Sequence, residues 1–241
     1  MINLKTNCVI APTIDCLWRE AMSLCVQKGE DFLVKGGSYV GQIRKQLPYF
    51  TGIITTPSER PLAPITPPGI PSPTSEDKIE YYFQRYIAGR EKEPNEVYTY
   101  GEFILQQLDQ IIVLLNDSKG NTNQATICIG DVSTTFLSDP PCLRSISFKV
   151  VNGKFQMCVY FRSWDLYAGL PENLGGLQLL KEYVVMHMDF PVEDGSIIAF
   201  SDGLHLYEQY FSIVDCLNVD KIKVSKGAEE DKKEFIGANG V

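Results

Sequence analysis

The sequence predicts an α+β fold, a single domain over residues 1–241 in which helices and a β-sheet share one core. Three observations predict it: a hairpin pattern over 145–161, a capped helix from about Tyr100 to Asn116, and a mostly apolar helix beyond Asn173. A chain of 241 residues is long enough to bury a large core. Its 44% apolar and 22% charged residues are typical of globular proteins.

The hairpin has the most specific local signal. Asn152-Gly153 favours a two-residue turn, because both residues of such a turn take positive φ. That turn pairs Val151 with Lys154, and the register continued from there puts apolar residues opposite one another on one face. The opposed apolar pairs are Ile146 with Val159, Phe148 with Met157, and Val150 with Phe155. We expect this face to serve either the core or a subunit interface.

The open end of the hairpin carries a candidate reactive thiol. The same register places Cys142 opposite Ser163, with Arg162 next to it. Strict alternation would send Cys142 and Arg162 to opposite faces, so direct contact requires a bulge or a twist at the strand end. A guanidinium next to a thiol lowers the thiol pKa and favours the thiolate. Taken alone, Cys142 is one of seven cysteines, and a buried structural role is the simpler interpretation.

Further elements are indicated on both sides of the hairpin. Thr99 and Glu102 have the spacing of a capping box for the helix that starts near Tyr100. Asp15 is a candidate cap for an earlier helix. That helix would present Leu17, Ala21, Leu24 and Cys25 on one face. Short strands are expected over 126–132 and 196–200.

Two segments differ in composition from the rest of the domain. The stretch 57–73 holds seven of the fourteen prolines, which excludes a continuous helix or a central strand. We interpret it as a long extended loop across the surface. From about Lys221 the chain forms a charged C-terminal tail, expected to lie on the surface.

Composition also excludes several classes of function. The net charge of −8 argues against a broad nucleic-acid-binding surface, which needs clustered Lys and Arg. No apolar run reaches the roughly 18 residues of a membrane helix, and residues 1–12 do not form a secretory signal. The seven scattered cysteines form no CxxC pair, which favours free thiols in a reducing compartment over disulfides or a zinc site. We therefore expect a soluble cytoplasmic protein without a metal, and with neither nucleic acid nor a membrane as partner.

Polar residues that follow the strands are the other candidates for chemistry. Arg162-Ser163-Trp164-Asp165 places a cation, a hydroxyl and a carboxylate after a buried strand, although a surface turn capped by Asp165 explains the pattern equally well. His205 and Tyr207 alternate and should share one face as a polar pair. His187 lies within the apolar helix and is expected to be structural. Neither a P-loop nor a dinucleotide-binding motif occurs.

The segment from Arg162 to Asn173 resembles the signature of thymidylate synthases, which reads R-S-x-D-x-x-x-G-x-P-x-N. The resemblance continues to Pro141-Cys142, to His205-Leu206-Tyr207, and to Tyr100-Gly101 and Asp109-Gln110-Ile111. The motifs occur in the family's order and at approximately its spacing, over about residues 97–211. The N-terminal third matches only loosely.

The resemblance implies a fold, a partner and a reaction. Members of the family have a large mixed sheet flanked by helices, as in the related dCMP hydroxymethylases, and two such sheets pack face to face in a homodimer. The reaction transfers a one-carbon unit from 5,10-methylene-tetrahydrofolate to C5 of dUMP and gives dTMP. By this resemblance Cys142 is the nucleophile that adds to C6 of the pyrimidine.

The resemblance also implies roles for the other motif residues. Arg162 and Ser163 would bind the phosphate of a pyrimidine nucleoside monophosphate, with Asn173 on the edge of the base. His205 and Tyr207 would bind the 3′-hydroxyl of the sugar. Asp165 and Gly169 would belong to the folate site, and Glu80 is the candidate acid–base carboxylate. A carboxylate typically replaces the asparagine in the dCMP hydroxymethylases, so Asn173 favours dUMP.

Departures from the bacterial pattern leave alternatives open. Leu143 follows the nucleophile where histidine is usual, and Asn123-Gln124 stands where arginines normally reach the partner's phosphate. Arg44 or Arg144 could replace them. The chain resembles the compact archaeal-type branch, so the one-carbon carrier could also be a modified pterin. The alternatives are a pyrimidine nucleotide hydroxymethylase acting on dCMP, CMP or dUMP, and a non-catalytic nucleotide-binding homologue.

Overall fold

A computed structural model describes residues 7–35, 39–94 and 96–217, which form two β-sheets with helices packed against them. The larger sheet has six strands, in the order β1 (Cys8–Ala11), β4 (Phe50–Ile54), β9 (Glu193–Ser201), β7 (Lys154–Phe161), β6 (Leu143–Val151) and β5 (Thr126–Cys128). The smaller sheet has four, in the order β2 (Glu30–Leu33), β3 (Ile43–Leu47), β10 (Leu204–Tyr207) and β8 (Trp164–Asp165). In the large sheet β1 pairs parallel with β4 and β7 with β9, while the other pairs are antiparallel. The predicted α+β fold with a large mixed sheet is thus confirmed.

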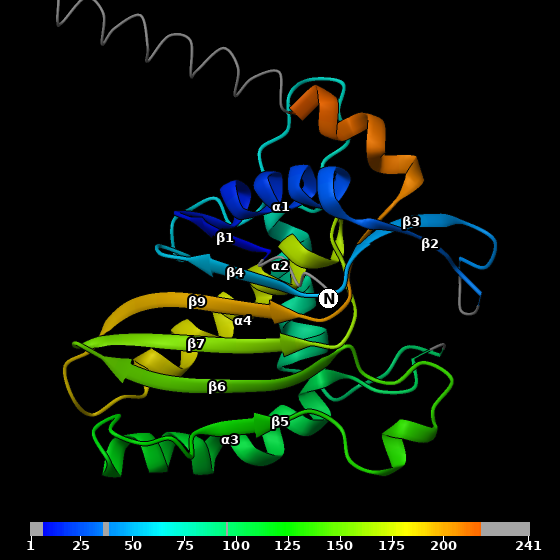
Figure 1. Cartoon of the computed structure of the whole chain (residues 1–241). Coiled ribbons are helices and arrows are strands. Elements are labelled where there is room, and N and C mark those ends of the chain that lie inside the picture. Colours follow the sequence, from blue (N-terminus) through cyan, green and yellow to red (C-terminus); the bar gives the residue numbers. More distant parts are fainter. Residues whose placement is uncertain (1–6, 36–38, 95, 218–241) are drawn as a thin grey trace, which may run out of the picture.

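The main helices are α1 (Ile14–Lys28), α2 (Glu76–Tyr82), α3 (Tyr100–Asp117) and α4 (Gly169–Met186). A five-residue π-helix, η1 (Phe83–Ile87), continues α2, and the 3₁₀ turns are η2 (Ser133–Phe136) and η3 (Glu208–Tyr210). Figure 1 shows the strands of the large sheet in front, with α2 and α4 behind them. The helices therefore pack on one face of the sheet, and no described helix crosses the other face. No helix among residues 7–35, 39–94 and 96–217 has the length and hydropathy needed to cross a membrane.

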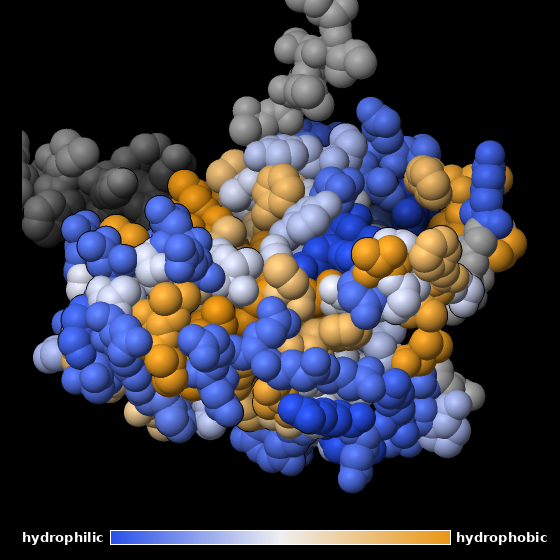
Figure 2. All heavy atoms as spheres, turned by 90° about the horizontal axis from the view of Figure 1, so that it is seen from below, coloured by the Kyte–Doolittle hydropathy of each residue, from blue (hydrophilic) through white to orange (hydrophobic). Residues whose placement is uncertain are grey.

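The hairpin forms in the register that the sequence predicts. Ile146 pairs with Val159, Phe148 with Met157, and Val150 with Phe155. The turn residues Asn152 and Gly153 have φ of 52° and 76°. Five of the six apolar residues on this face are buried and Val150 is half-buried, so the face belongs to the core. Figure 2 views the molecule from below, from the side of α3 and β5. The hydrophobic side chains visible on this surface lie among hydrophilic ones.

The register changes at the end that carries Cys142. A β-bulge between Leu143 and Ser145 lets Leu143 pair with Phe161, one position off the register of the rest of the hairpin. Cys142 consequently faces Arg162, whose backbone N–H donates to the Cys142 carbonyl at 2.9 Å. The extrapolated pairing of Cys142 with Ser163 is therefore wrong by one residue. The cause is the β-bulge between Leu143 and Ser145, which brings Cys142 and Arg162 to the same face of the hairpin.

Helix boundaries differ from the prediction where a cap lies a few residues away from the expected one. Thr13, not Asp15, caps α1, and its hydroxyl accepts from the backbone N–H of Cys16. The capping box of Thr99 and Glu102 is confirmed at the start of α3. Helix α4 begins at Gly169, so Asn173 lies in its second turn rather than before it.

Strand β5 is shorter than predicted and ends at Cys128, shortly before Gly130 takes a φ of 81°. Strand β9 is longer than predicted, at Glu193–Ser201.

The proline-rich segment 57–73 contains neither helix nor strand, as expected. It is not confined to the surface, because Leu62 and Ala63 within it are buried in the core. The Tyr167 hydroxyl donates to the Pro71 carbonyl at 2.6 Å, which ties this segment to the start of α4. The predicted charged tail from about residue 221 lies outside the described residues.

Candidate functional site

Cys142 lies at the start of β6, half-buried, with Arg162 beside it on β7's end. The Arg162 guanidinium donates to the carbonyls of Pro141, at 3.1 Å, and of Pro140. It also lies 3.4 Å from the Asp139 carboxylate. Together with the backbone bond from Arg162 to Cys142, these contacts hold the segment that presents the thiol.

The electrostatics of the thiol only partly follow the sequence argument. Arg162 lowers the pKa of Cys142, as expected from a neighbouring guanidinium. Burial has the larger and opposite effect, and Asp139 adds to it, so the pKa of Cys142 is raised above its ordinary value. The thiol is therefore protonated near neutral pH, and the expected thiolate does not form in this arrangement without a further change.

A cluster of tyrosines surrounds Cys142. The Tyr100 hydroxyl accepts from the backbone N–H of Leu143 at 3.2 Å, which fixes the residue after the thiol. Tyr86 packs edge-on against Tyr100 with ring centroids 5.0 Å apart and stacks on Tyr82 at 5.6 Å. Burial, with smaller contributions from the neighbouring Cys142 and Asp139, raises the pKa of Tyr98 to about 12. The packed rings of Tyr100, Tyr86 and Tyr82 thus extend from the segment that carries the thiol to the end of α2.

Local backbone features bring this cluster together. The i+5 winding of η1 continues α2 and carries Tyr86 into the site; π-helical segments of this kind are often found at functional sites. Tyr100 is the first residue of α3, which approaches the loop after η1 very closely. A Cβ at Gly101 would lie 2.0 Å from the Gly89 carbonyl oxygen, so only glycine permits this approach.

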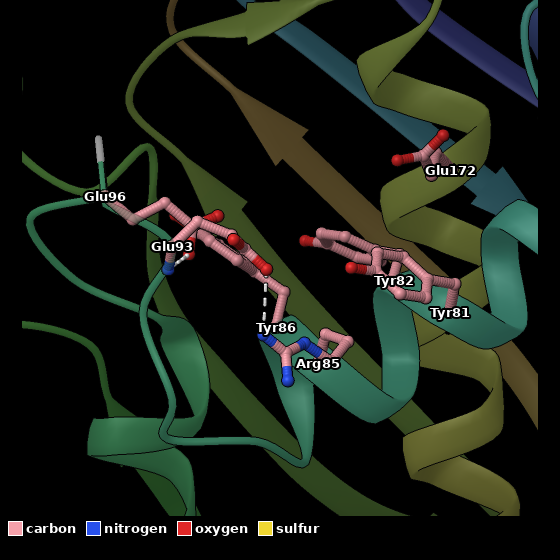
Figure 3. Close-up of a pocket in the computed structure, with 7 residues that line it drawn as sticks. All are labelled: Tyr81, Tyr82, Arg85, Tyr86, Glu93, Glu96 and Glu172. Carbon is pink, nitrogen blue, oxygen red and sulfur yellow. Dashed lines mark hydrogen bonds and ion pairs between the residues drawn. The ribbon is translucent and has the colours of Figure 1, made fainter.

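A pocket of about 210 Å³ opens beside the cluster (Figure 3). Its lining residues are Tyr81, Tyr82, Arg85, Tyr86, Glu93, Glu96 and Glu172. Arg85 pairs with Glu93 at 2.9 Å, while the Glu96 carboxylate accepts from the backbone N–H of Glu93. Glu172 enters from α4 on the far side, and its carboxylate accepts from the Thr74 hydroxyl at 2.8 Å. The pocket thus combines aromatic walls with an excess of carboxylates.

Asn173 lies next to this pocket, and both ends of its amide are bonded. Its Oδ1 accepts from the indole Nε1 of Trp164 at 2.9 Å. Its Nδ2 donates to the hydroxyl of Tyr82, also at 2.9 Å.

His205 and Tyr207 form the polar pair that the sequence predicts, with ring centroids 5.3 Å apart on β10. His205 Nδ1 lies 2.9 Å from the Gly203 carbonyl, so this nitrogen carries the proton and Nε2 presents a lone pair. Burial, together with the charge of Arg44, lowers the pKa of His205 to about 4. The small sheet sets their neighbours: Tyr207 is paired with Arg44 on β3, and His205 with Asp165 on β8.

Asp165 has the capping role that the sequence left as an alternative. Its carboxylate accepts from the backbone N–H groups of Tyr167, Ala168 and Gly169 at 3.1–3.3 Å, at the start of α4. A Cβ on Gly169 would lie 3.3 Å from the Asp165 side chain, so these two residues pack closely. Ser163 is half-buried between Arg162 and β8.

The structure does not bring every predicted residue to the site. Glu80 is exposed on α2 and does not line the pocket, because the inward-facing residue of that turn is the buried Ile79. His187, which was expected to be structural and not part of the site, is exposed at the end of α4, where its Nδ1 lies 2.7 Å from the Tyr183 carbonyl oxygen. Arg144 lies beside Gly130. Among the described residues, no group of three or more His, Cys, Asp or Glu side chains is placed to hold a metal ion.

The sequence did not predict that four further residues would lie at or beside the site, namely Tyr82, Tyr86, Tyr98 and Glu172. The tyrosine-rich runs 81–86 and 98–100 were the available signal. It is weak, because tyrosines at such spacing are more often part of a core than of a site.

Comparison with known proteins identifies the family of this chain. The family model described as "Thymidylate synthase" matches residues 84–223, more than half of the chain, which includes Cys142, the segment 162–173 and His205. The chain therefore belongs to the thymidylate synthase family, which implies an enzyme of the methyltransferase type.

Three relatives give the range of similarity. A Methanosarcina barkeri protein is 26% identical over 215 residues, covering 86% of this chain and 92% of the relative. One from Methanothermobacter thermautotrophicus is 32% identical over 143 residues, covering 57% and 62%. Both carry the name "Putative thymidylate synthase". A "Thymidylate synthase" of Wigglesworthia glossinidia brevipalpis is 30% identical over 132 residues, covering 54% and 47%.

The buried imidazole gives a prediction that does not depend on substrate. We expect the ring signals of His205 to stay constant from pH 8 down to about 5 and to move with a midpoint near 4. NMR of the two histidines measures this, with a His187→Gln variant to assign the signals.

The same lowered pKa makes the free energy of unfolding fall as pH drops from about 6.5 towards 4, since the unfolded chain then binds more protons. A His205 midpoint near 6.5 would contradict the buried, neutral state.

Proposed function

We propose that the protein transfers a one-carbon unit from 5,10-methylene-tetrahydrofolate, or from a modified pterin carrier, to C5 of dUMP and so forms dTMP. The observation that carries the proposal is the bulge in β6, which sets Cys142 against Arg162 beside the tyrosine cluster in a member of this family. Family membership alone supports the coarser statement of a thymidylate-synthase-like enzyme.

Cys142 has the central chemical role in this proposal. Its sulfur adds to C6 of the pyrimidine, which makes C5 a nucleophile towards the one-carbon unit. The carrier supplies that carbon and the hydride that completes the methyl group. C5 loses its proton once the carbon is attached, and the S–C6 bond breaks as the hydride is delivered, which regenerates the thiol. Because burial raises the pKa of the Cys142 thiol, the thiol must give its proton to water or to O4 of the pyrimidine as the sulfur adds to C6. The Arg162 guanidinium, already beside the thiol, is the cation that stabilises the resulting sulfur anion.

The nucleotide is assigned to the residues of the family motifs. Asn173 faces the edge of the base, and the free Nε2 of His205 and the hydroxyl of Tyr207 bind the sugar 3′-hydroxyl. Arg162 and Ser163 bind the phosphate. Arg44 is favoured over Arg144 as the additional cation, because its buried Nε has no hydrogen-bond partner in the described part of the chain and it lies beside Tyr207.

The one-carbon carrier is assigned to the pocket in front of α2. The stacked rings of Tyr82 and Tyr86 suit a flat heterocycle such as a pterin. Asp165 and Gly169, at the start of α4, lie at the border between the two sites in this proposal. The Asp165 carboxylate then acts both as helix cap and as an acceptor for the pterin ring.

Transfer of the one-carbon unit to dUMP gives the principal prediction. Purified protein supplied with dUMP and 5,10-methylene-tetrahydrofolate should form dTMP and dihydrofolate in equal amounts, as measured by chromatography and absorbance. Cys142→Ser should reduce this rate at least about 10³-fold, because the hydroxyl is a far weaker nucleophile than the thiol.

Two other outcomes define the competing functions. A hydroxymethylated nucleotide, identified by mass spectrometry, would favour the hydroxymethylase alternative. The structural support for this alternative is that Tyr82 and Glu172 line the pocket with polar groups able to hold a water molecule. If Cys142-dependent release of tritium from C5 is absent with dUMP, dCMP, UMP and CMP alike, the protein is a non-catalytic nucleotide-binding homologue.

Glu172 is our candidate for the acid–base carboxylate, in place of the exposed Glu80. It lines the pocket together with Tyr82, whose hydroxyl contacts Asn173, and it is the residue adjacent to Asn173 in α4. A carboxylate inside the pocket can exchange protons with the reacting nucleotide, whereas a solvent-exposed one cannot.

Matched variants test this assignment. Glu172→Gln should lower kcat about 10²-fold or more, with a smaller effect on nucleotide binding, whereas Glu80→Gln should leave kcat within about two-fold of the wild type. Steady-state kinetics and calorimetric binding of dUMP separate the two effects. A large loss of kcat in Glu80→Gln alone would reverse the assignment.

The open face of the large sheet is our candidate for the homodimer interface. One row of paired residues crosses it, from Ile10 through Ile53 and Ile198 to Cys158. Ile10 is 64% exposed, and Phe200 packs between Tyr49 and Tyr160 on the same face. Packing two such faces together would bury this apolar row, as expected for a face-to-face dimer.

Light scattering on a size-exclusion column should give the mass of two chains at micromolar concentration. Ile198→Lys, at the centre of the row, should shift the protein to the mass of one chain, because it buries a charge in the interface. Val113→Lys on α3 should leave the dimer intact. A wild-type monomer under these conditions would remove the interface from the proposal.

A further inference from the structure

The amide of Asn173 is held between two aromatic residues that come from different parts of the fold. Trp164 belongs to β8, in the small sheet, and Tyr82 ends α2. Each makes a 2.9 Å hydrogen bond, Trp164 to Oδ1 and Tyr82 to Nδ2 of the amide. Asn173 itself is half-buried in the second turn of α4, beside the pocket.

Of the two partners, only Trp164 determines which way the amide points. An indole N–H can donate but cannot accept, so the atom that faces it must be the amide oxygen. A hydroxyl both donates and accepts, so Tyr82 is compatible with either end of the amide. Rotating the amide by half a turn would set its NH₂ group against the indole N–H, donor against donor, and leave both without a partner.

Trp164 is itself rigidly placed. Its ring stacks on Phe161 with centroids 4.0 Å apart and an angle of 6° between the planes. The residue is 2% exposed, and its backbone N–H donates to the Gly203 carbonyl at 3.0 Å. The indole N–H therefore cannot swing away to accommodate a rotated amide.

The bonded amide keeps one acceptor and one donor for a ligand. Oδ1 retains its second lone pair, and Nδ2 its second hydrogen. Uracil presents a donor at N3 and an acceptor at O4, which complement this pair. Cytosine presents an acceptor at N3 and a donor at its amino group, which would require the amide to rotate.

We propose that Trp164 locks the Asn173 amide in the orientation that accepts a uracil nucleotide and rejects a cytosine nucleotide. Trp164 is thus a specificity-determining residue that acts through Asn173 and does not touch the substrate. The inference rests on the proposed function only in placing Asn173 at the edge of the base. An asparagine without such a lock could turn over and serve either base.

The test compares nucleotide binding with and without the indole N–H. Trp164→Phe removes the donor and keeps an aromatic ring against Phe161, while Tyr82→Phe removes the partner that does not set the orientation. Calorimetric Kd values for dUMP and dCMP are measured for both variants and for the wild type. Thermal melts confirm that each variant is folded.

The wild type should prefer dUMP. In Trp164→Phe the ratio of the two Kd values should narrow by roughly ten-fold, chiefly through tighter dCMP binding, because the rotated amide no longer meets a donor. In Tyr82→Phe both Kd values should change together and leave their ratio within about two-fold of the wild type. If Trp164→Phe does not fold, benzothienylalanine at position 164 replaces the N–H by sulfur in a ring of nearly the same shape.

An unchanged ratio in the folded Trp164 variant would overturn the lock, as would a wild type that binds neither nucleotide or binds both equally. Failure of the proposed reaction has a different signature. A dUMP preference that depends on Trp164, without formation of dTMP, would refute the one-carbon transfer and leave the lock in place.

Discussion

The whole site depends on the one-residue bulge in β6. Without it, Cys142 and Arg162 would lie on opposite faces of the hairpin, and the backbone bond from Arg162 to the Cys142 carbonyl could not form. The bulge shifts the pairing at the hairpin end by one residue, so that the thiol of Cys142 lies next to the guanidinium of Arg162. Arg162 then holds the prolines before the thiol, and Tyr100 holds the backbone N–H after it. The nucleophile is thus positioned from both sides by residues of other elements.

The small sheet has the corresponding function for the rest of the site. Strand β8 is only two residues long, yet it carries Trp164 and Asp165 next to β10 with His205. Its two side chains have different roles. Trp164 orients the amide of Asn173, and Asp165 caps the helix on which Asn173 lies. Such a short strand is stable because β10, with β3 beyond it, supports it and because Trp164 is stacked on Phe161 at the end of β7.

Burial governs the protonation of the site more than any ion pair does. It raises the pKa of the Cys142 thiol despite the neighbouring Arg162, and it keeps His205 neutral despite Asp165 on the adjacent strand. It also raises the pKa values of Tyr98 and Tyr100 beside the thiol. In this low-dielectric setting an ionised side chain is unstable without an opposite charge nearby, so a thiolate at Cys142 depends on the cation of Arg162.

The sequence by itself determined the hairpin and its register, the capping box of α3, the α+β class and the order of the motifs, because each depends on side chains close together along the chain. It also brought Cys142 and Arg162 within one residue of each other. Only the tertiary structure decided the bulge, the helical position of Asn173, the exposure of Glu80 and the entry of Tyr82, Tyr86 and Glu172 into the site. These features depend on how α2, α4 and the two sheets pack, and no local pattern of residues encodes the contacts between elements that lie far apart in the sequence.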